Sequence, residues 1–184
     1  LCKKVDALAI EKDFTKADAS RVLKKLSSKA VGKIVRKEGM RSDGRDLLTV
    51  RPIEVDMAPL PPAHGSVVFT RGETQSLATC TLGDQGMQLR VDDALQPNSE
   101  KKFYLQYAFP PSSVGETGRT GAPGRREVGH GALAEKALRY ALPDSKAFPY
   151  TIRVESLITE SCGSSSMASV CGGCLALLDA DVPL

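Results

Sequence analysis

A strand-like segment, a turn of small polar residues and an apolar helix follow one another near the end of this 184-residue chain. Residues 150–159 place their apolar side chains on one face, as in a strand with one buried side. Residues 160–169 then run Glu-Ser-Cys-Gly-Ser-Ser-Ser-Met-Ala-Ser, and residues 167–178 are apolar on almost every side. This order predicts a cluster of serines at the N-terminus of a buried helix.

The serine cluster has two interpretations. A helix N-terminus offers backbone N–H groups and the positive end of the helix dipole, and hydroxyls add further donors. Ser164, Ser165 and Ser166 could therefore hold a phosphate. Serines are also common N-terminal caps of helices, and the motif alone favours neither interpretation.

A second loop-to-helix boundary carries two adjacent arginines. Within residues 121–131, Arg125, Arg126 and His130 fall on one short element. Arginine side chains bind phosphate oxygens with a planar, two-pronged geometry. Arginines alone would ordinarily be a solvated pair, but a serine cluster in the same small domain makes a site for a polyanion the better hypothesis.

Several long motifs occur in one order along the chain: Phe69 to Gln75, Phe109 to Gly118, Arg125 to Gly131 and Gly163 to Gly173. Together they resemble the polynucleotide phosphorylase (polyribonucleotide nucleotidyltransferase) family, and within it the second of two RNase PH-type cores. The resemblance covers residues 41–184. Residues 103–107 and 171–175 are most similar to plant and algal organellar members.

An α+β fold is expected, because strand-like segments come first as hairpins and are followed by a helix, a strand and a helix. The resemblance makes this an RNase PH-type core, a mixed sheet with packed helices. A capping box at residues 15–18 begins a basic helix that Gly39 ends. The resemblance implies that residues 1–40 end a helical linker domain and that residues 41–184 form the N-terminal part of the second core, incomplete at its C-terminus.

Three local expectations can be compared with the structure. Residues 66–70 and 75–82 form a hairpin around Arg71, for which we favour a structural role although its side chain could approach the site. Residues 92–102 are polar and are expected to form an exposed loop. The helix that follows Arg126 is expected to bury one apolar face, made of Leu133, Ala134, Ala137, Leu138 and Ala141.

The resemblance implies a 3′-to-5′ phosphorolytic exoribonuclease. Inorganic phosphate, the co-substrate, attacks the 3′ ends of single-stranded RNA and releases nucleoside diphosphates, and the reverse reaction polymerises RNA without a template. The implied site residues are Ser164, Ser165 and Ser166 for phosphate, and Arg125, Arg126, His130 and Arg71 for RNA. Mg²⁺ or Mn²⁺ would share the charge. The family's metal-binding carboxylates lie beyond the serine helix, so no metal ligand is expected up to Leu184 and this chain alone is expected to be inactive.

Two other classes compete with this hypothesis. A non-catalytic RNase PH-type ring subunit would bind and guide RNA without cutting it, and a plain phosphate-binding or scaffold domain would explain the serines but not the arginines. Cys171 and Cys174 have CxxC spacing, yet no second pair of ligands accompanies them, so tight helix packing is favoured over zinc or redox chemistry. Cys162 and Asp181 depart from the family, which usually has asparagine and glycine there, and put full activity in question.

Composition adds little to the function but sets some limits. A net charge of +3 with 26% charged residues does not by itself indicate nucleic-acid binding. No apolar run approaches the ~20 residues of a membrane-spanning helix. By resemblance, we expect a homotrimer in an organelle, with the chloroplast favoured over the mitochondrion and the bacterial cytoplasm a weaker alternative.

Overall fold

The structure is a computed structural model that describes residues 15–93, 96–119 and 121–184, and it divides into two compact units after Val50. In the first unit, helix α2 (Lys16–Glu38) begins at Thr15, whose hydroxyl accepts a hydrogen bond from Asp18 N–H. The helix ends at Gly39, which has left-handed φ of 67°. Both helix ends agree with the sequence prediction.

The division after Val50 lies ten residues beyond the boundary that we predicted near Met40. Residues 41–50 form a turn region, and Asp46 within it makes an isolated antiparallel bridge to Met40, just after the helix. This bridge ties the turn to the end of helix α2, and so the turn groups with the helix.

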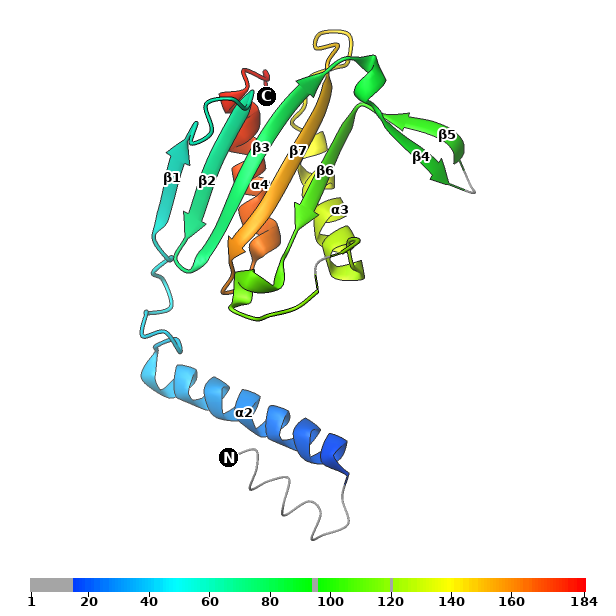
Figure 1. The fold of residues 1–184 in the computed structure, drawn as a ribbon. Coiled ribbons are helices and arrows are strands. Elements are labelled where there is room, and N and C mark those ends of the chain that lie inside the picture. Colours follow the sequence, from blue (N-terminus) through cyan, green and yellow to red (C-terminus); the bar gives the residue numbers. More distant parts are fainter. Residues whose placement is uncertain (1–14, 94–95, 120) are drawn as a thin grey trace. The chain divides into compact units, whose positions relative to one another are not determined.

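The second unit is a five-stranded mixed sheet with two helices (Figure 1). The strands lie in the order β1-β2-β3-β7-β6, and only β6 and β7 are parallel. The elements are β1 (Ile53–Met57), β2 (Gly65–Arg71), β3 (Thr74–Gly83), β6 (Phe103–Ala108), α3 (Arg125–Arg139), β7 (Thr151–Glu160) and α4 (Ser165–Asp179). This is the α+β arrangement that the sequence predicts.

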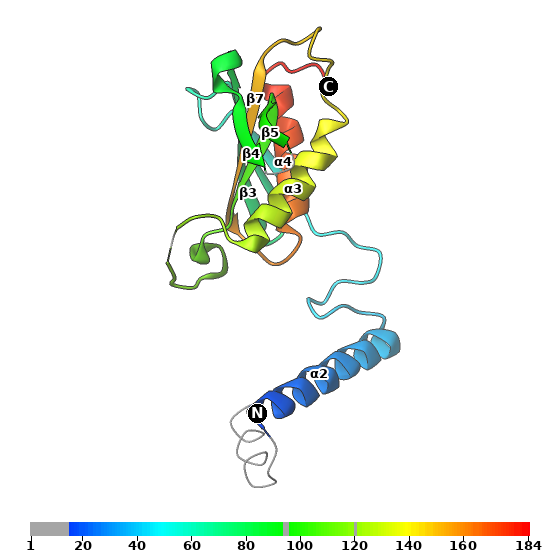
Figure 2. The same cartoon turned by 90° about the vertical axis from the view of Figure 1, so that its right-hand side faces the viewer.

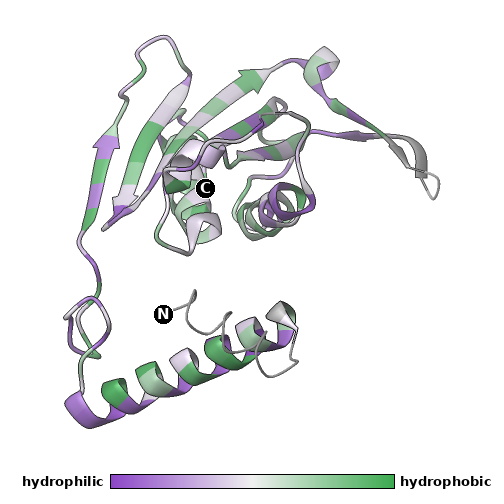
Figure 3. Cartoon of the chain, turned by 60° about the horizontal axis from the view of Figure 1, so that its bottom comes forward, coloured by the Kyte–Doolittle hydropathy of each residue, from purple (hydrophilic) through white to green (hydrophobic). Residues whose placement is uncertain are grey.

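Both helices cover the same face of the sheet, as the view along its edge shows (Figure 2). The alternation predicted for strand β7 is confirmed, since Ile152, Val154 and Ile158 are buried on the helix side. Apolar and polar residues alternate along the strands of the sheet (Figure 3). Helix α4 is the central element of the core, packing on strands β2, β3 and β7 and on helix α3.

The loop predicted for residues 92–102 is wrong. Strand β4 (Leu89–Asp93) and strand β5 (Gln96–Lys101) pair antiparallel as a separate two-stranded ribbon, and a short 3₁₀ helix, Gln85–Met87, precedes them. Within the described residues, no other helix or strand packs extensively against this ribbon. Strand β5 in particular lacks the apolar alternation from which a strand is predicted.

The buried face predicted for helix α3 is only partly right. Ala134 and Leu138 are buried, together with Gly131, but Leu133 is 46% exposed and the two remaining alanines of the predicted face are exposed as well. The helix packs against strand β6 at the edge of the sheet and against helix α4. Such an edge position buries a narrow stripe with a spacing of three and four residues.

Asp181 lies just after helix α4 with φ of 56°, in the left-handed region that favours glycine. A glycine, which the family resemblance implies at this position, would adopt this geometry without strain. Within the described residues, no helix is long and apolar enough to span a membrane.

We predict that Gly65→Ala destabilises the second unit. A Cβ at Gly65 would overlap the carbonyl oxygen of Ala176 and lie 2.8 Å from the backbone nitrogen of Ala180, so helix α4 would have to move away from strand β2. The expected loss is about 1–3 kcal/mol of unfolding free energy, measured by denaturant titration. Gly129→Ala is the control, because a Cβ there would have nothing within 4 Å and the helix should gain up to about 1 kcal/mol. Equal stability of the two variants would contradict the close approach.

Candidate anion-binding site

The first turn of helix α4 is built around two residues with positive φ. Gly163 has φ of 89° and Ser164, the N-terminal cap position, has φ of 54°. The Ser164 side chain makes no capping hydrogen bond. Since the N–H groups of Ser165 and Ser166 lie in the first turn, where a helix supplies no acceptor, they are available to an anion.

A buried threonine holds the turn that leads into this helix. Thr74 Oγ1 accepts a hydrogen bond from Cys162 N–H and donates one to the carbonyl oxygen of Gly163, both at 3.0 Å. Arg71 donates to the same carbonyl oxygen at 3.2 Å. The hairpin between strands β2 and β3 thus supports the serine turn, and the Arg71 side chain reaches this turn next to the candidate site.

The proline-containing loop after strand β6 supports the same turn from the other side. Its 3₁₀ helix, Pro111–Val114, contains Ser113, whose hydroxyl donates to the carbonyl oxygen of Ile158 at 2.7 Å. The carbonyl oxygen of Ser113 accepts from Ser161 N–H at 2.9 Å. The turn is therefore fixed by two segments that are distant in sequence.

Ser165 faces the protein interior rather than the solvent. Its side chain is 2% exposed, and its Oγ lies 2.7 Å from the hydroxyl oxygen of Tyr107. Its carbonyl oxygen accepts a hydrogen bond from Ser169 Oγ at 3.1 Å. Of the three predicted phosphate-binding hydroxyls, only those of the exposed Ser164 and the half-buried Ser166 are positioned to meet a ligand directly, whereas Ser165 offers its backbone N–H.

Aromatic rings connect this helix to the arginines of helix α3. The rings of Tyr107 and Phe109 are stacked with centroids 6.3 Å apart, and the guanidinium carbon of Arg126 lies 4.4 Å from the Phe109 ring centre. His130 tilts against Tyr107 at 5.3 Å, and its Nδ1 is buried with no hydrogen-bond partner among the described residues. A continuous series of contacts therefore runs from Arg126 to Ser165.

The electrostatics of this cluster favour a protonated tyrosine and an ionised glutamate. Burial raises the pKa of Tyr107, although the hydrogen bond with Ser165 and the charge of Arg126 act in the opposite direction. The N–H groups of Phe109 and Gly124 lower the pKa of Glu127, because they donate to its carboxylate at 3.0 and 2.8 Å. Glu127 thereby fixes the start of helix α3 to the end of strand β6.

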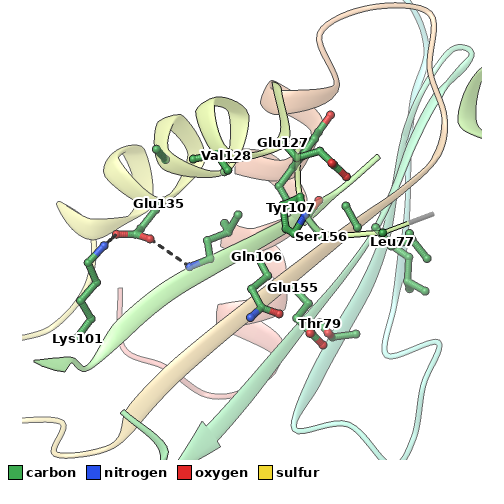
Figure 4. A pocket seen from close by; sticks show the side chains of 17 residues that line it. Leu77, Thr79, Lys101, Gln106, Tyr107, Glu127, Val128, Glu135, Glu155 and Ser156 are labelled. Atoms are coloured by element: carbon green, nitrogen blue, oxygen red, sulfur yellow. Dashed lines mark hydrogen bonds and ion pairs between the residues drawn. The ribbon is translucent and has the colours of Figure 1, made fainter. Parts of the chain in front are cut away.

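Glutamates on helix α3 also close the edge of the sheet. Glu135 accepts a hydrogen bond from Leu105 N–H of edge strand β6 and forms an ion pair with Lys101 at 3.2 Å (Figure 4). Together with the bond from Phe109 N–H to Glu127, this occupies outward-pointing donors of the edge strand. Covering an edge in this way hinders pairing with another strand and keeps α3 in place.

A groove of about 740 Å³ lies beside the site rather than at it (Figure 4). It is lined by strands β3, β6 and β7, by helix α3 and by Gly121 and Pro123. Tyr107 and Glu127 border it, but none of the predicted phosphate-binding or RNA-binding residues lines it. The candidate site is thus the surface where the first turns of α3 and α4 meet the end of β6.

The cysteine pair of helix α4 does not form a metal site within the described residues, where no group of three potential metal ligands occurs. The packing interpretation holds for the two intervening glycines, since Gly172 lies against Ala78 and Gly173 against Leu138. It is wrong for Cys171, which is exposed on the outer side of the helix. Desolvation, followed by the neighbouring Cys174, raises the pKa of the Cys171 thiol, which disfavours thiolate chemistry.

The structure brings together several of the residues that the sequence singles out. Ser165, His130 and Arg126 meet around two aromatic rings, and Arg71 contacts the turn that precedes Ser164. Exposed Arg125 begins the same helix but makes no contact of this kind among the described residues. Sequence reasoning missed Tyr107 and Phe109 as site residues, although their alternation at the end of a strand just before a long loop was a usable signal.

The fold and site define a class of protein: an α+β core in which two helix N-termini, one rich in serine and one bearing arginines, form a surface suited to anions. The chain belongs to the 3′ exoribonuclease family, whose domain 1 matches residues 49–183. The crystal structure of rice (Oryza sativa) Rrp46 has the same fold, with a TM-score of 0.60 and 22% identity over 78% of this chain and 63% of that one.

More similar relatives are whole proteins of much greater length. The polyribonucleotide nucleotidyltransferase of Chlamydia felis is 60% identical over 171 residues, which are 93% of this chain and 24% of that protein. The probable polyribonucleotide nucleotidyltransferase 1, chloroplastic, of Oryza sativa subsp. japonica is also 60% identical over 171 residues, 93% of this chain and 19% of that protein. The chain thus spans about a quarter or less of these relatives.

We predict that Thr74→Val destabilises the protein by about 1–3 kcal/mol, because the N–H of Cys162 loses its partner and the carbonyl oxygen of Gly163 keeps only Arg71 among the described residues. Thr79→Val is the matched control on the same strand, since no hydrogen bond of the Thr79 side chain is seen among the described residues. Denaturant unfolding of both variants measures the difference. A Thr74→Val variant as stable as the control would show that this hydroxyl does not hold the serine turn.

Proposed function

We propose that the complete polypeptide containing this chain is a phosphorolytic 3′-to-5′ exoribonuclease that also runs in reverse as a template-independent RNA polymerase. The observation that carries the proposal is the series of contacts from Arg126 through Phe109 and Tyr107 to Ser165. It brings two anion-binding elements to one surface, as a reaction between inorganic phosphate and an RNA phosphodiester requires. The relatives named polyribonucleotide nucleotidyltransferase support the same activity.

In this proposal, the start of helix α4 binds the attacking inorganic phosphate. The N–H groups of Ser165 and Ser166, the hydroxyls of Ser164 and Ser166, and the helix dipole all favour a negative charge there. Because these donors are already in place before phosphate arrives, they stabilise the charge without reorganising. Gly163 and Ser164, both with positive φ, form the turn that leads directly to these donors.

The start of helix α3 binds the RNA backbone. Arg125 and Arg126 are exposed, and within the described residues neither makes an ion pair with an acid, so their guanidinium groups remain available to phosphate oxygens. Phe109 fixes the Arg126 side chain from below by a cation–π contact. His130 and Arg71 border the same surface and would donate hydrogen bonds to RNA.

The reaction needs a further positive charge, for which we propose Mg²⁺ or Mn²⁺. A divalent ion would neutralise charge on the transferring phosphoryl group. Since no cluster of three potential ligands occurs within the described ranges, we propose that carboxylates of another part of the complete polypeptide bind the ion.

We further propose that residues 41–184 belong to the second of two RNase PH-type cores, that residues 1–40 end a helical linker, and that the protein acts in an organelle. The chloroplastic rice relative supports the chloroplast, which we favour over the mitochondrion. Bacterial relatives such as that of Chlamydia felis are equally similar, and the bacterial cytoplasm remains the competing location.

The function is tested with two double variants of the complete polypeptide. Arg125→Ala with Arg126→Ala should raise the KM for single-stranded RNA roughly tenfold or more and reduce its salt dependence, because bonds to charged groups and released counterions are lost. Ser164→Gly with Ser166→Ala should raise the KM for inorganic phosphate roughly tenfold while the backbone donors remain. Steady-state release of nucleoside diphosphate, with RNA and phosphate varied separately, measures both constants.

Lys136→Ala is the control, because it removes an exposed positive charge from the other end of helix α3. If the arginine variant loses only phosphate affinity and the serine variant binds phosphate normally, the two roles are reversed. A complete, folded polypeptide that binds RNA but releases no nucleoside diphosphate would identify it as a non-catalytic ring subunit.

We also propose that the complete protein is a homotrimer. Light scattering of the complete polypeptide at working concentration should give three times the mass of one chain. A monomer at that concentration would contradict this proposal without affecting the assignment of the site.

A further inference from the structure

Tyr107 touches both halves of the candidate site. Its hydroxyl oxygen lies 2.7 Å from Ser165 Oγ in the first turn of helix α4. Its ring centre lies 5.3 Å from that of His130 of helix α3, and the ring stacks on Phe109. The guanidinium group of Arg126 in turn lies over the Phe109 ring. The side chain is 6% exposed, so it cannot itself bind a phosphate or an RNA base at the surface.

Strand β6 and helix α3 fix the position of this ring. It projects from strand β6, and helix α3 crosses so close that a Cβ at Gly131 would lie 3.4 Å from the Cβ of Tyr107. The bond from Phe109 N–H to Glu127 holds the end of the strand against the first turn of α3. The hydroxyl of Tyr107 therefore has little freedom to move away from α4.

Hydrogen bonds hold both the carbonyl oxygen and the side-chain hydroxyl of Ser165. Its carbonyl oxygen accepts from Ser169 Oγ, which in turn accepts from Ser156 Oγ of strand β7 at 2.7 Å. Its side chain is held by Tyr107 on the other side. These two bonds set how the first turn of α4 is rotated about the helix axis, and hence where the N–H groups of Ser165 and Ser166 point.

We propose that Tyr107 is a positioning residue for phosphate: through its hydroxyl it orients the first turn of helix α4, and through its ring it keeps that turn in register with the arginine-bearing start of helix α3. The inference rests on the proposed function, in which α4 binds inorganic phosphate. It goes further by assigning a role to a buried tyrosine that contacts neither phosphate nor RNA.

The test uses Tyr107→Phe, Ser165→Ala and the combination of both in the complete polypeptide. Removing the Tyr107 hydroxyl should raise the KM for inorganic phosphate about three- to tenfold, which corresponds to the loss of one ordinary hydrogen bond. The KM for RNA should stay within about twofold, because the ring remains on Phe109 and His130. Both single changes break the same hydrogen bond between Tyr107 and Ser165. The combined variant should therefore raise the KM for phosphate no more than the more damaging single change does.

Tyr104→Phe is the matched control. Tyr104 is also buried in strand β6, but its hydroxyl donates to the carbonyl oxygen of Met87, away from the serine turn. Tyr104→Phe should leave the KM for phosphate unchanged. A purely structural role of Tyr107 would instead lower the melting temperature and change both KM values together, and that outcome would overturn the proposal.

Direct binding of inorganic phosphate, measured by calorimetry on the same proteins, separates this inference from the proposed function. If phosphate binds and Tyr107→Phe weakens it while no phosphorolysis occurs, the positioning role holds and the activity is wrong. If Tyr107→Phe binds phosphate as the unchanged protein does, or if the effects of the two single changes add, the positioning role is wrong. The positioning role is equally wrong if the complete polypeptide binds no phosphate.

Discussion

The close contact of helix α4 with the sheet is the constraint on which the rest of the structure depends. There is no room for a side chain at Gly65, where strand β2 meets the backbone of helix α4. On another side of α4, a Cβ at Gly173 would lie 2.9 Å from Leu138 of helix α3. Between the helix and the sheet, the buried hydroxyls of Ser76, Ser156 and Ser169 form a chain of hydrogen bonds. Because Ser156 donates its single proton to Ser169, Ser76 must donate to Ser156, and the chain ends on the Ser165 carbonyl.

This hydrogen-bonded chain favours one packing register of the strands against helix α4. Each buried hydroxyl would be costly if it were left unpaired, so the strands and the helix that contribute them can pack well in only one register. That register also determines the site, because the last acceptor of the chain belongs to the first turn of α4. The candidate anion-binding surface is therefore a direct extension of the core and not a loop placed upon it.

The sequence predicts the parts of this arrangement that have a local cause. The turn of small polar residues, the apolar helix and the alternating strand β7 follow from residues that lie next to one another, and the arginine-bearing helix start follows from its loop. What depends on distant partners was missed. The polar strand β5 has only its pairing with β4 to define it, the exposure of Leu133 reflects an edge position, and the burial of Ser165 reflects a tyrosine 58 residues away.

Ser165 shows how local sequence and distant packing partners act together on one residue. A Gly-Ser-Ser-Ser run gives three hydroxyls equal weight, but a helix start turns successive side chains by about 100°, so they cannot all face one ligand. Ser164 and Ser166 remain accessible, whereas Ser165 lies under the turn with the Tyr107 hydroxyl. The run therefore combines two features: the hydroxyls of Ser164 and Ser166 remain accessible at the helix start, and the hydroxyl of Ser165 between them contacts Tyr107 beside Phe109, on which Arg126 lies.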